Sequence, residues 1–163
     1  MPLAQTFLGS VVKRLLSYKV LAEKTFEQLS DAEMHYQPNA TSNSVAIIVR
    51  HMAGNMLSRW TDFLTTDGEK DWRNRDSEFE ETQQSKEELI AFWEKGWQCC
   101  LQAIQSLGAD DLEKTITIRG EPLSVIDAIN RQLAHYPYHV GQIIYIGKLL
   151  RDGDWKNLSM PKK

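Results

Sequence analysis

Histidines are the residues of this chain whose type and spacing point most clearly to chemistry. His135 and His139 are four residues apart, so on a helix their Cβ atoms would lie about 5–6 Å from each other. Two imidazoles at that separation can bind one ion at about 2.0–2.1 Å. A third ligand must come from another helix, and His51 lies in the apolar part of an earlier helical segment. The spacing therefore predicts a metal site with His51, His135 and His139 as ligands.

Three imidazole ligands leave coordination positions open for water or substrate, which is typical of catalytic rather than structural sites. Imidazole suits zinc, nickel, copper or iron, whereas Mg²⁺ and Ca²⁺ prefer oxygen ligands. A structural alternative stays open, because a histidine on an apolar face is often a core residue that hydrogen-bonds a neighbour. The pair also lacks the adjacent glutamate of a His-Glu-x-x-His motif. His35 lies in a polar stretch, and we expect it at the surface.

Four segments have the helical periodicity needed to position these histidines. They cover residues 3–29, 45–66, 86–107 and 125–151. Expected N-caps are Ser44, Ser85 (with Glu88 three residues on) and Ser124. The apolar faces of the first and last segments are expected to bury the following residues, among others: Leu8, Val11, Val12, Leu15, Leu16, Val20 and Leu21 in the first, and Ile126, Ile129, Leu133 and Tyr136 in the last. We expect an all-α fold of one domain over residues 1–163, a four-helix bundle of the up-and-down type with a possible long crossover connection.

The connections carry further predictions. Residues 67–84 form a long polar connection, and such loops are usually functional or mobile. Residues 115–122 alternate and then turn, so they form either a short β-hairpin or an extended loop. Pro137 lies between two predicted ligands and removes one backbone hydrogen bond of the last helix. We therefore expect a kink or a widened turn there.

Composition excludes several classes of function. The 163 residues include 19 basic and 22 acidic side chains, a formal net charge of -3, without the Lys/Arg clusters that nucleic-acid binding needs. No apolar run approaches the about 18 residues of a membrane span, and the N-terminus does not resemble a signal peptide. The two cysteines, Cys99 and Cys100, are adjacent and do not suggest a structural disulfide. We expect a cytoplasmic protein that binds neither nucleic acid nor membrane.

Two segments resemble the signature of the DinB-like superfamily. Residues 135–143 read His-Tyr-Pro-Tyr-His-Val-Gly-Gln-Ile, similar to that family's last-helix pattern of two histidines followed by x-Gly-Gln-Ile. Residues 44–52 are similar to its second-helix segment, an apolar run that closes on a single ligand histidine, here His51. The resemblance covers about residues 3–151, and residues 72–79 look like a feature of one uncharacterised subgroup.

This resemblance implies a four-helix bundle with a three-histidine metal site, usually zinc or nickel, and a homodimer. It also implies a thiol S-transferase that uses a low-molecular-weight thiol, with hydrolases among the relatives. Our leading hypothesis is therefore a metal-dependent thiol transferase acting on a small-molecule substrate, with no catalytic residue assigned beyond the ligands. The alternatives are a metal-dependent hydrolase at the same site and a non-enzymatic dimerising bundle.

Four further residues are candidates for supporting roles. Arg73 and Arg75 in the long connection could contact an anionic thiol cofactor, since guanidinium groups match carboxylates. The alternative is a surface salt-bridge network with Asp71, Asp76 and Glu78. Asn55 or Gln142 could steady a ligand imidazole from the second shell, a prediction that depends on their proximity along the helices alone.

Overall fold

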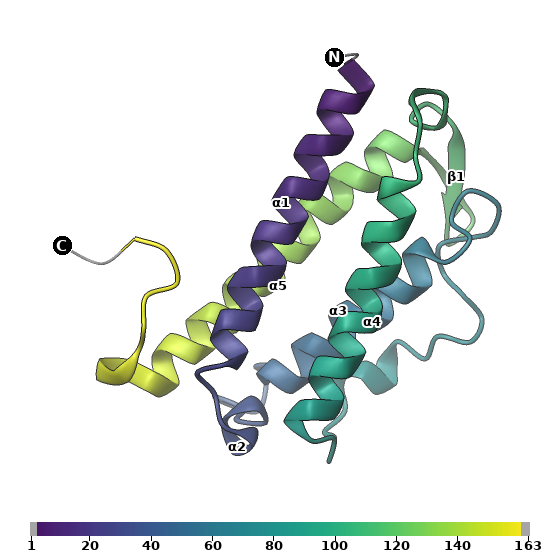
Figure 1. The fold of residues 1–163 in the computed structure, drawn as a ribbon. Coiled ribbons are helices and arrows are strands. Elements are labelled where there is room, and N and C mark those ends of the chain that lie inside the picture. The colour runs from purple at the N-terminus through teal and green to yellow at the C-terminus, as the bar shows by residue number, and fades with distance from the viewer. Residues whose placement is uncertain (1–2, 161–163) are drawn as a thin grey trace.

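The computed structural model describes residues 3–160, and most of this part of the chain is helical (Figure 1). The α-helices are α1 (Leu3–Phe26), α2 (Asp31–Met34), α3 (Val45–Trp60), α4 (Lys86–Gln105) and α5 (Val125–Arg151). The strands are β1 (Thr115–Ile118) and β2 (Glu121–Ser124), and short 3-10 helices are η1 (Asp76–Phe79), η2 (Ala109–Asp111) and η3 (Asp152–Asp154). None of the helices in residues 3–160 is long and apolar enough to cross a membrane.

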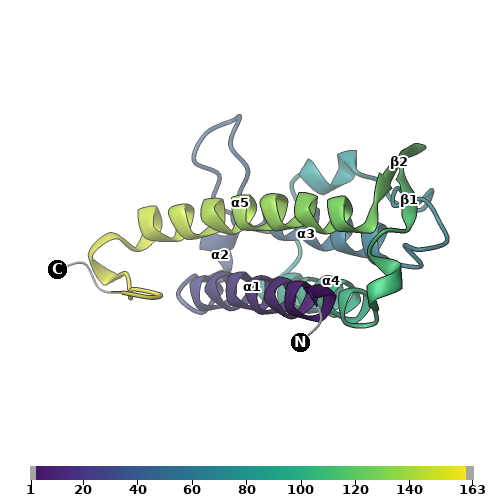
Figure 2. The same ribbon diagram turned by 90° about the horizontal axis from the view of Figure 1, so that it is seen from above.

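The four long helices pack around one core. In Figure 2, α5 and α3 form one layer, and α1 and α4 form the other. The main contacts join α3 to α4, α1 to α5, α3 to α5 and α1 to α4, so each long helix has two principal neighbours. Helix α2 is a short addition that contacts α3.

The order of helix directions differs from a simple up-and-down bundle. Gly96 of α4 lies against Ala53 of α3, and further along both helices Cys99 lies 3.5 Å from Thr61. Helices α3 and α4 therefore run parallel, whereas α5 runs antiparallel to α3 (Figure 1). Parallel neighbours need a connection that returns along the molecule, and residues 61–85 provide it. The structure therefore has the long crossover that the sequence prediction allowed only as a possibility, in place of the up-and-down order.

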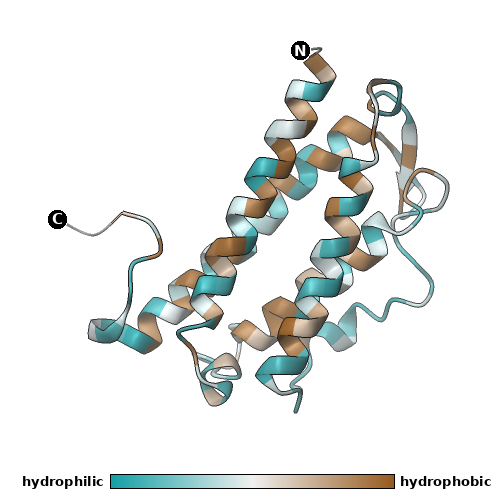
Figure 3. Ribbon diagram, viewed as in Figure 1, coloured by the Kyte–Doolittle hydropathy of each residue, from teal (hydrophilic) through white to brown (hydrophobic). Residues whose placement is uncertain are grey.

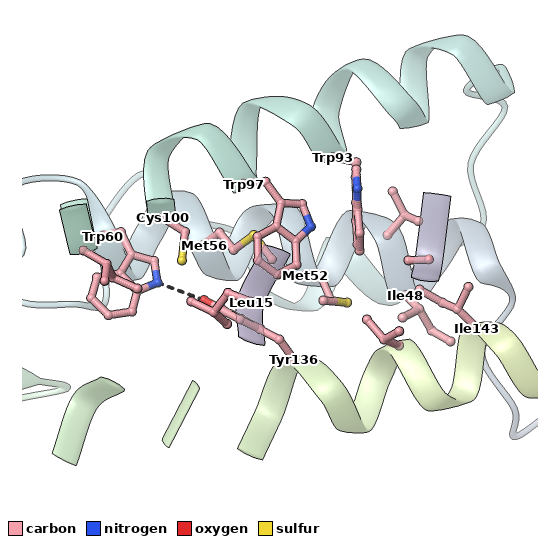
Figure 4. Close-up of a cluster of buried hydrophobic side chains, with 14 of the residues drawn as sticks. Leu15, Ile48, Met52, Met56, Trp60, Trp93, Trp97, Cys100, Tyr136 and Ile143 are labelled. Carbon is pink, nitrogen blue, oxygen red and sulfur yellow. Dashed lines mark hydrogen bonds between the residues drawn. The ribbon is translucent and has the colours of Figure 1, made fainter. Parts of the chain in front are cut away.

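The core lies between the layers and is rich in aromatic and sulfur-containing side chains. Hydrophobic residues recur along the four long helices (Figure 3), and a cluster of them is buried between these helices. Fully buried side chains shown in Figure 4 include Leu15, Ile48, Met52, Met56, Trp93, Trp97, Cys100, Tyr136 and Ile143. At one end of this cluster, Trp60 donates from Nε1 to the Tyr136 hydroxyl at 3.0 Å, which joins α3 to α5. Burial on this scale makes hydrophobic packing the main stabilising term.

Several sequence predictions of elements are confirmed. Ser44, Ser85 and Ser124 are the N-caps of α3, α4 and α5, and Ser85 forms a capping box with Glu88. Residues 115–124 form the hairpin rather than an extended loop, with Ile118 paired to Glu121. Both cysteines are free.

Helix ends and parts of the apolar faces were predicted incorrectly. Helix α1 ends at Phe26 rather than at residue 29, because Ser30 caps a separate short helix, α2. Helix α3 ends at Trp60 rather than at residue 66, since Thr61 is extended and Asp62 has a positive φ of 48°. Neither break changes the hydrophobic pattern, so periodicity could not locate them.

Three apolar residues expected in the core are substantially exposed. Leu16, Val20 and Ile126 retain 41%, 43% and 36% of their accessible surface. They lie at the edges of their helical stripes, where the neighbouring helices do not reach. Pro137 does not end α5, which continues through it as α-helix from Val125 to Arg151.

Candidate metal centre

His51 on α3 and His135 and His139 on α5 direct their Nε2 atoms toward one another. Nε2 of His135 lies 3.4 Å from Nε2 of His51 and 3.0 Å from Nε2 of His139. One potential ligand atom from each residue lies within 4.8 Å of the other two. His51 and His139 are buried and His135 is half-buried. The fold thus brings together, from two antiparallel helices, the three histidines that the sequence predicted as ligands.

The opposite ring nitrogen of each histidine has its own acceptor. In each case Nδ1 donates to a side-chain oxygen, and the pairs are His51 with Glu78 Oε2 (2.9 Å), His135 with Gln132 Oε1 (3.2 Å) and His139 with Gln142 Oε1 (2.8 Å). A neutral imidazole that donates from Nδ1 presents a lone pair at Nε2. Three lone pairs therefore face one point, where they repel one another unless a cation lies between them. This donor set fits a divalent ion such as zinc or nickel.

Electrostatics keep two of the rings in their metal-binding form. Burial, followed by the neighbouring His139 and His51, lowers the pKa of His135 to about 3. Burial also lowers the pKa of His139, although its hydrogen bond with Gln142 opposes the shift. Because a metal binds only neutral imidazole, these shifts favour the ligand state at neutral pH.

Glu78 orients the ring of His51 through a hydrogen bond. The sequence did not predict this contact. Glu78 lies in η1, within the long connection, and its carboxylate is buried. Arg73 binds this carboxylate with two hydrogen bonds, from Nε at 2.7 Å and from Nη2 at 2.8 Å. Burial raises the pKa of Glu78, but the hydrogen bonds from His51 and Arg73 outweigh it and lower that pKa below its usual range. The buried Arg73–Glu78–His51 chain holds an ionised carboxylate against the ligand ring.

Comparison with known proteins identifies the family of this chain. The family model described as "Protein of unknown function (DUF1572)" matches residues 2–163. The chain belongs to the DUF1572 family. A search of curated proteins found no match. The chemistry of this DUF1572 protein must therefore be argued from its site.

The four supporting residues predicted from the sequence lie in different settings. Gln142 contacts His139, as described above. Asn55 lines the same cavity as His51 and His135, but its Oδ1 accepts a hydrogen bond from Tyr136 at 3.2 Å. Arg73 is buried against Glu78, and Arg75 lies on the exposed side with its guanidinium 5.1 Å from the ring centroid of Phe79. Phe79 in turn lies beside the ring of His51, 4.8 Å between centroids.

Two of the remaining predictions concern residues away from the centre. His35 is half-buried rather than at the surface, because its Nε2 bonds the backbone oxygen of Gln84 at 2.8 Å. It lies in a different place from the other three histidines and is not part of the cluster. Cys100, for which no disulfide was expected, is buried in the core as a free thiol, and burial raises the pKa of this thiol well above its ordinary value.

Gly54 makes room for the Glu78 carboxylate in the DUF1572 protein. A Cβ at this position would lie 2.3 Å from Oε1 of Glu78. We expect Gly54→Ala to lower the free energy of unfolding by about 1–3 kcal/mol, the usual cost of overpacking. Gly9→Ala is the matched control, since Gly9 lies on exposed α1 with no atom within 4 Å of an added Cβ. Urea denaturation should show Gly9→Ala stabilised by about 0.5–1 kcal/mol, and a similar gain in Gly54→Ala would contradict the geometry.

The stability of the metal-free protein is expected to fall as the pH drops below about 6.5. Folded His135 stays neutral down to about pH 3, whereas the unfolded chain protonates this residue near its ordinary pKa. Between these values the unfolded state binds more protons, so acid favours unfolding. Urea midpoints measured with a chelator at pH 7.5 and pH 5 should fall, and His135→Asn should reduce the fall. An identical fall in His135→Asn would remove His135 from the explanation.

Proposed function

We propose that this DUF1572 protein is a DinB-like, metal-dependent enzyme that transfers a low-molecular-weight thiol to an electrophilic small molecule. The observation that carries the proposal is the convergence of three Nε2 atoms, each belonging to a ring whose Nδ1 is fixed by an acceptor. Such second-shell fixation is typical of metal-binding histidines. The packing of α1, α3, α4 and α5 supports a four-helix bundle of the DinB type as the scaffold.

In this proposal His51, His135 and His139 hold one divalent ion, zinc or nickel. When bound, such an ion lowers the pKa of a thiol that coordinates it and so supplies a nucleophilic thiolate near neutral pH. Glu78 and Arg73 fix the ring of His51, and Gln132 and Gln142 fix the other two. These residues position the ligands. The thiol proton passes to solvent, the sulfur forms a bond to the electrophilic carbon, and the bond from that carbon to its leaving group breaks, so that the leaving group departs to solvent with the electron pair.

The cavity beside the centre favours thiol transfer over hydrolysis. It has a volume of about 230 Å³ and is lined by His51 and His135 together with Asn55, Gln132 and five arginines. Among the described residues, no aspartate or glutamate lines it. Hydrolysis by a metal-bound water commonly uses a positioned general base, and guanidinium groups cannot serve as one. A thiol that is activated by direct coordination needs no such base.

Two further parts of the proposal concern assembly and location. We infer a homodimer formed through α5, where Tyr138, Tyr145 and Leu149 remain 63%, 70% and 54% exposed. Large apolar groups gathered on one helix face often mark an interface, and light scattering on the purified protein checks this by its mass. We place the protein in the cytoplasm, where thiols stay reduced, in keeping with its two free cysteines.

The activity can be tested with metal-free, zinc-loaded and nickel-loaded protein. Each sample is incubated with a low-molecular-weight thiol and a small alkylating electrophile, and the thioether product is measured by mass spectrometry. We expect product only with metal, and none above background with His139→Ala. Hydrolysis of ester or amide substrates without thioether formation would support the hydrolase instead. A metal-loaded protein inactive in both assays would support the non-enzymatic bundle.

A further inference from the structure

The cavity beside the histidine cluster collects guanidinium groups from four separate parts of the chain. Arg59 comes from α3, Arg73 and Arg75 from the long connection, Arg119 from the turn of the β-hairpin, and Arg131 from α5. Their spacing in the sequence matches neither helical nor strand periodicity, so the sequence alone does not predict that they lie together. Their convergence is therefore produced by the tertiary fold, at the point where the connection and the hairpin meet α3 and α5.

The hairpin turn helps to place one of these groups. Arg119 and Gly120 both have positive φ, 57° and 76°, as a two-residue type I′ turn requires. Asp67 accepts hydrogen bonds from both of their backbone N–H groups at 2.8 Å. These bonds lower the pKa of Asp67 to about 2 and tie the long connection to the hairpin. Arg119 is thus held at the cavity by backbone contacts.

Positive charge in the cavity exceeds the negative charge around it. Glu69 is shared by Arg59, Arg73 and Arg119, at 3.5, 3.5 and 3.0 Å. The second carboxylate, Glu78, is bound by Arg73. Three of the five guanidinium groups therefore share two buried or half-buried carboxylates, and Arg75 and Arg131 pair with neither of them.

Three of the five retain donors that are not paired within the protein. Arg131 makes no hydrogen bond or ion pair with the described residues, 3–160. Among residues 3–160, Arg75 pairs with one carboxylate, the exposed Asp76 at 3.8 Å, and its guanidinium lies over the ring of Phe79. Arg59 retains only 6% of its accessible surface, yet its Nε has no hydrogen-bond partner among the described residues. A buried donor without a partner costs free energy, and the guanidinium donors of Arg131 and Arg75 remain available to an anionic ligand.

Burial and the neighbouring positive charges both disfavour the charged form of Arg59. Burial lowers the pKa of Arg59, and the adjacent Arg73, Arg131 and Arg119 lower it further, while Glu69 opposes the shift. Like charges held this close in a concave site attract an anion and raise its local concentration. Arginine is also the side chain best suited to bind carboxylate or phosphate groups with two parallel hydrogen bonds.

We propose that this cavity binds a small organic anion with two or more negative groups, and that this anion is the thiol or its electrophilic partner. The inference rests on the proposed function, since it assigns the substrate class of the same centre. A volume of about 230 Å³ fits a small molecule, because one water occupies about 30 Å³. His51 and His135 line the same cavity, so an anion held by Arg131 at the rim lies next to the ligand rings.

Isothermal titration calorimetry on the full chain, metal-free and zinc-loaded, tests this proposal. The probes are succinate, inorganic phosphate and uncharged succinamide. We expect succinate or phosphate to bind and succinamide not to bind. Tighter binding of succinate assigns carboxylate groups to the ligand, and tighter binding of phosphate assigns a phosphate ester.

Arg131→Gln is the decisive variant, because removing an unpaired side chain leaves no carboxylate without its partner. It should weaken anion binding by roughly 10- to 100-fold in both metal states, the equivalent of a lost charge-assisted hydrogen bond. Arg119→Gln is a second variant with the same expected direction. Arg14→Gln is the matched control, since exposed Arg14 on α1 lies outside the cavity.

The outcomes separate this inference from the proposed function. Zinc content and zinc affinity are measured on the same samples and should be equal in wild type and Arg131→Gln. Two results would overturn the anion site while leaving the metal centre intact. One is that the anions bind no tighter than succinamide. The other is that they bind Arg131→Gln and Arg119→Gln as tightly as the wild type. A protein that binds succinate through Arg131 but binds no zinc would retain the anion site and lose the proposed function.

Discussion

Replacing His139 with alanine is expected to reduce zinc affinity by more than about 100-fold. Loss of an outer partner of a metal ligand already costs roughly 10- to 100-fold, and the ligand itself contributes more. His139 directs its Nε2 to within 3.0 Å of Nε2 of His135, so its removal opens one third of the donor set. Competition titration with a chromophoric chelator gives the affinities of wild type and variant.

His35→Ala is the control for this experiment. It removes a histidine outside the cluster, so zinc affinity should stay within a factor of about 2 of wild type, well below the loss expected from even an outer partner. Metal analysis of untagged wild type should find one ion per chain. Equal zinc affinity in wild type and His139→Ala would contradict the assignment of the ligands.

Substituting Glu78 with glutamine is expected to weaken zinc binding by roughly 10- to 100-fold with all three ligands in place. The amide removes the negative charge that faces Nδ1 of His51 at 2.9 Å, and it leaves the buried Arg73 with only the more distant Glu69, at 3.5 Å, as an ion-pair partner. Breaking a buried pair by removing one charge usually costs about 3–5 kcal/mol of stability. Chelator competition and urea denaturation measure the two effects separately.

The neighbouring Asp76 provides the control for Glu78→Gln. It lies in the same 3-10 helix with its side chain 95% exposed, and Asp76→Asn should change neither quantity by a measurable amount. We expect Glu78→Gln to lower both the zinc affinity and the free energy of unfolding. A variant that loses stability but keeps wild-type zinc affinity would give Glu78 a purely structural role.

The proximity of His135 and His139 on α5 could be predicted because its geometry is local. Four residues on a helix fix the relative position of His135 and His139 whatever the rest of the fold does. The position of His51 depends on how α3 packs against α5, which periodicity does not determine; its place on an apolar helical segment made it a candidate, and the resemblance to a known family favoured it. The structure then placed this ring against the other two.

Of the residues that hydrogen-bond the three histidines, some could be predicted from local helical spacing and one could not. Gln142 lies three residues after His139, and helical spacing was sufficient to nominate it. Gln132 lies three residues before His135 and carries the same signal, which the sequence analysis overlooked. Glu78 could not be found by spacing, because its contact with His51 depends on the path of an irregular connection. The nearby Gly54, against which Glu78 packs, gave only an indirect hint.

The convergence of the arginines was also beyond the reach of the sequence. Arg73 and Arg75 were noted because they are close in the chain, whereas Arg59, Arg119 and Arg131 belong to elements with no regular relation to them. The direction of α4 relative to α3 decides where the connection 61–85 runs, and hence which charges meet. A pattern of hydrophobic residues specifies the buried faces of helices but not the course of a polar crossover.

X-ray absorption spectroscopy of the zinc-loaded protein addresses the nitrogen cluster most directly. The spectrum should fit three imidazole nitrogens at about 2.0–2.1 Å from the ion, and the imidazole signal should decrease in His51→Ala as well as in His139→Ala. A spectrum with a single imidazole, or one that His51→Ala leaves unchanged, would contradict a centre shared by α3 and α5.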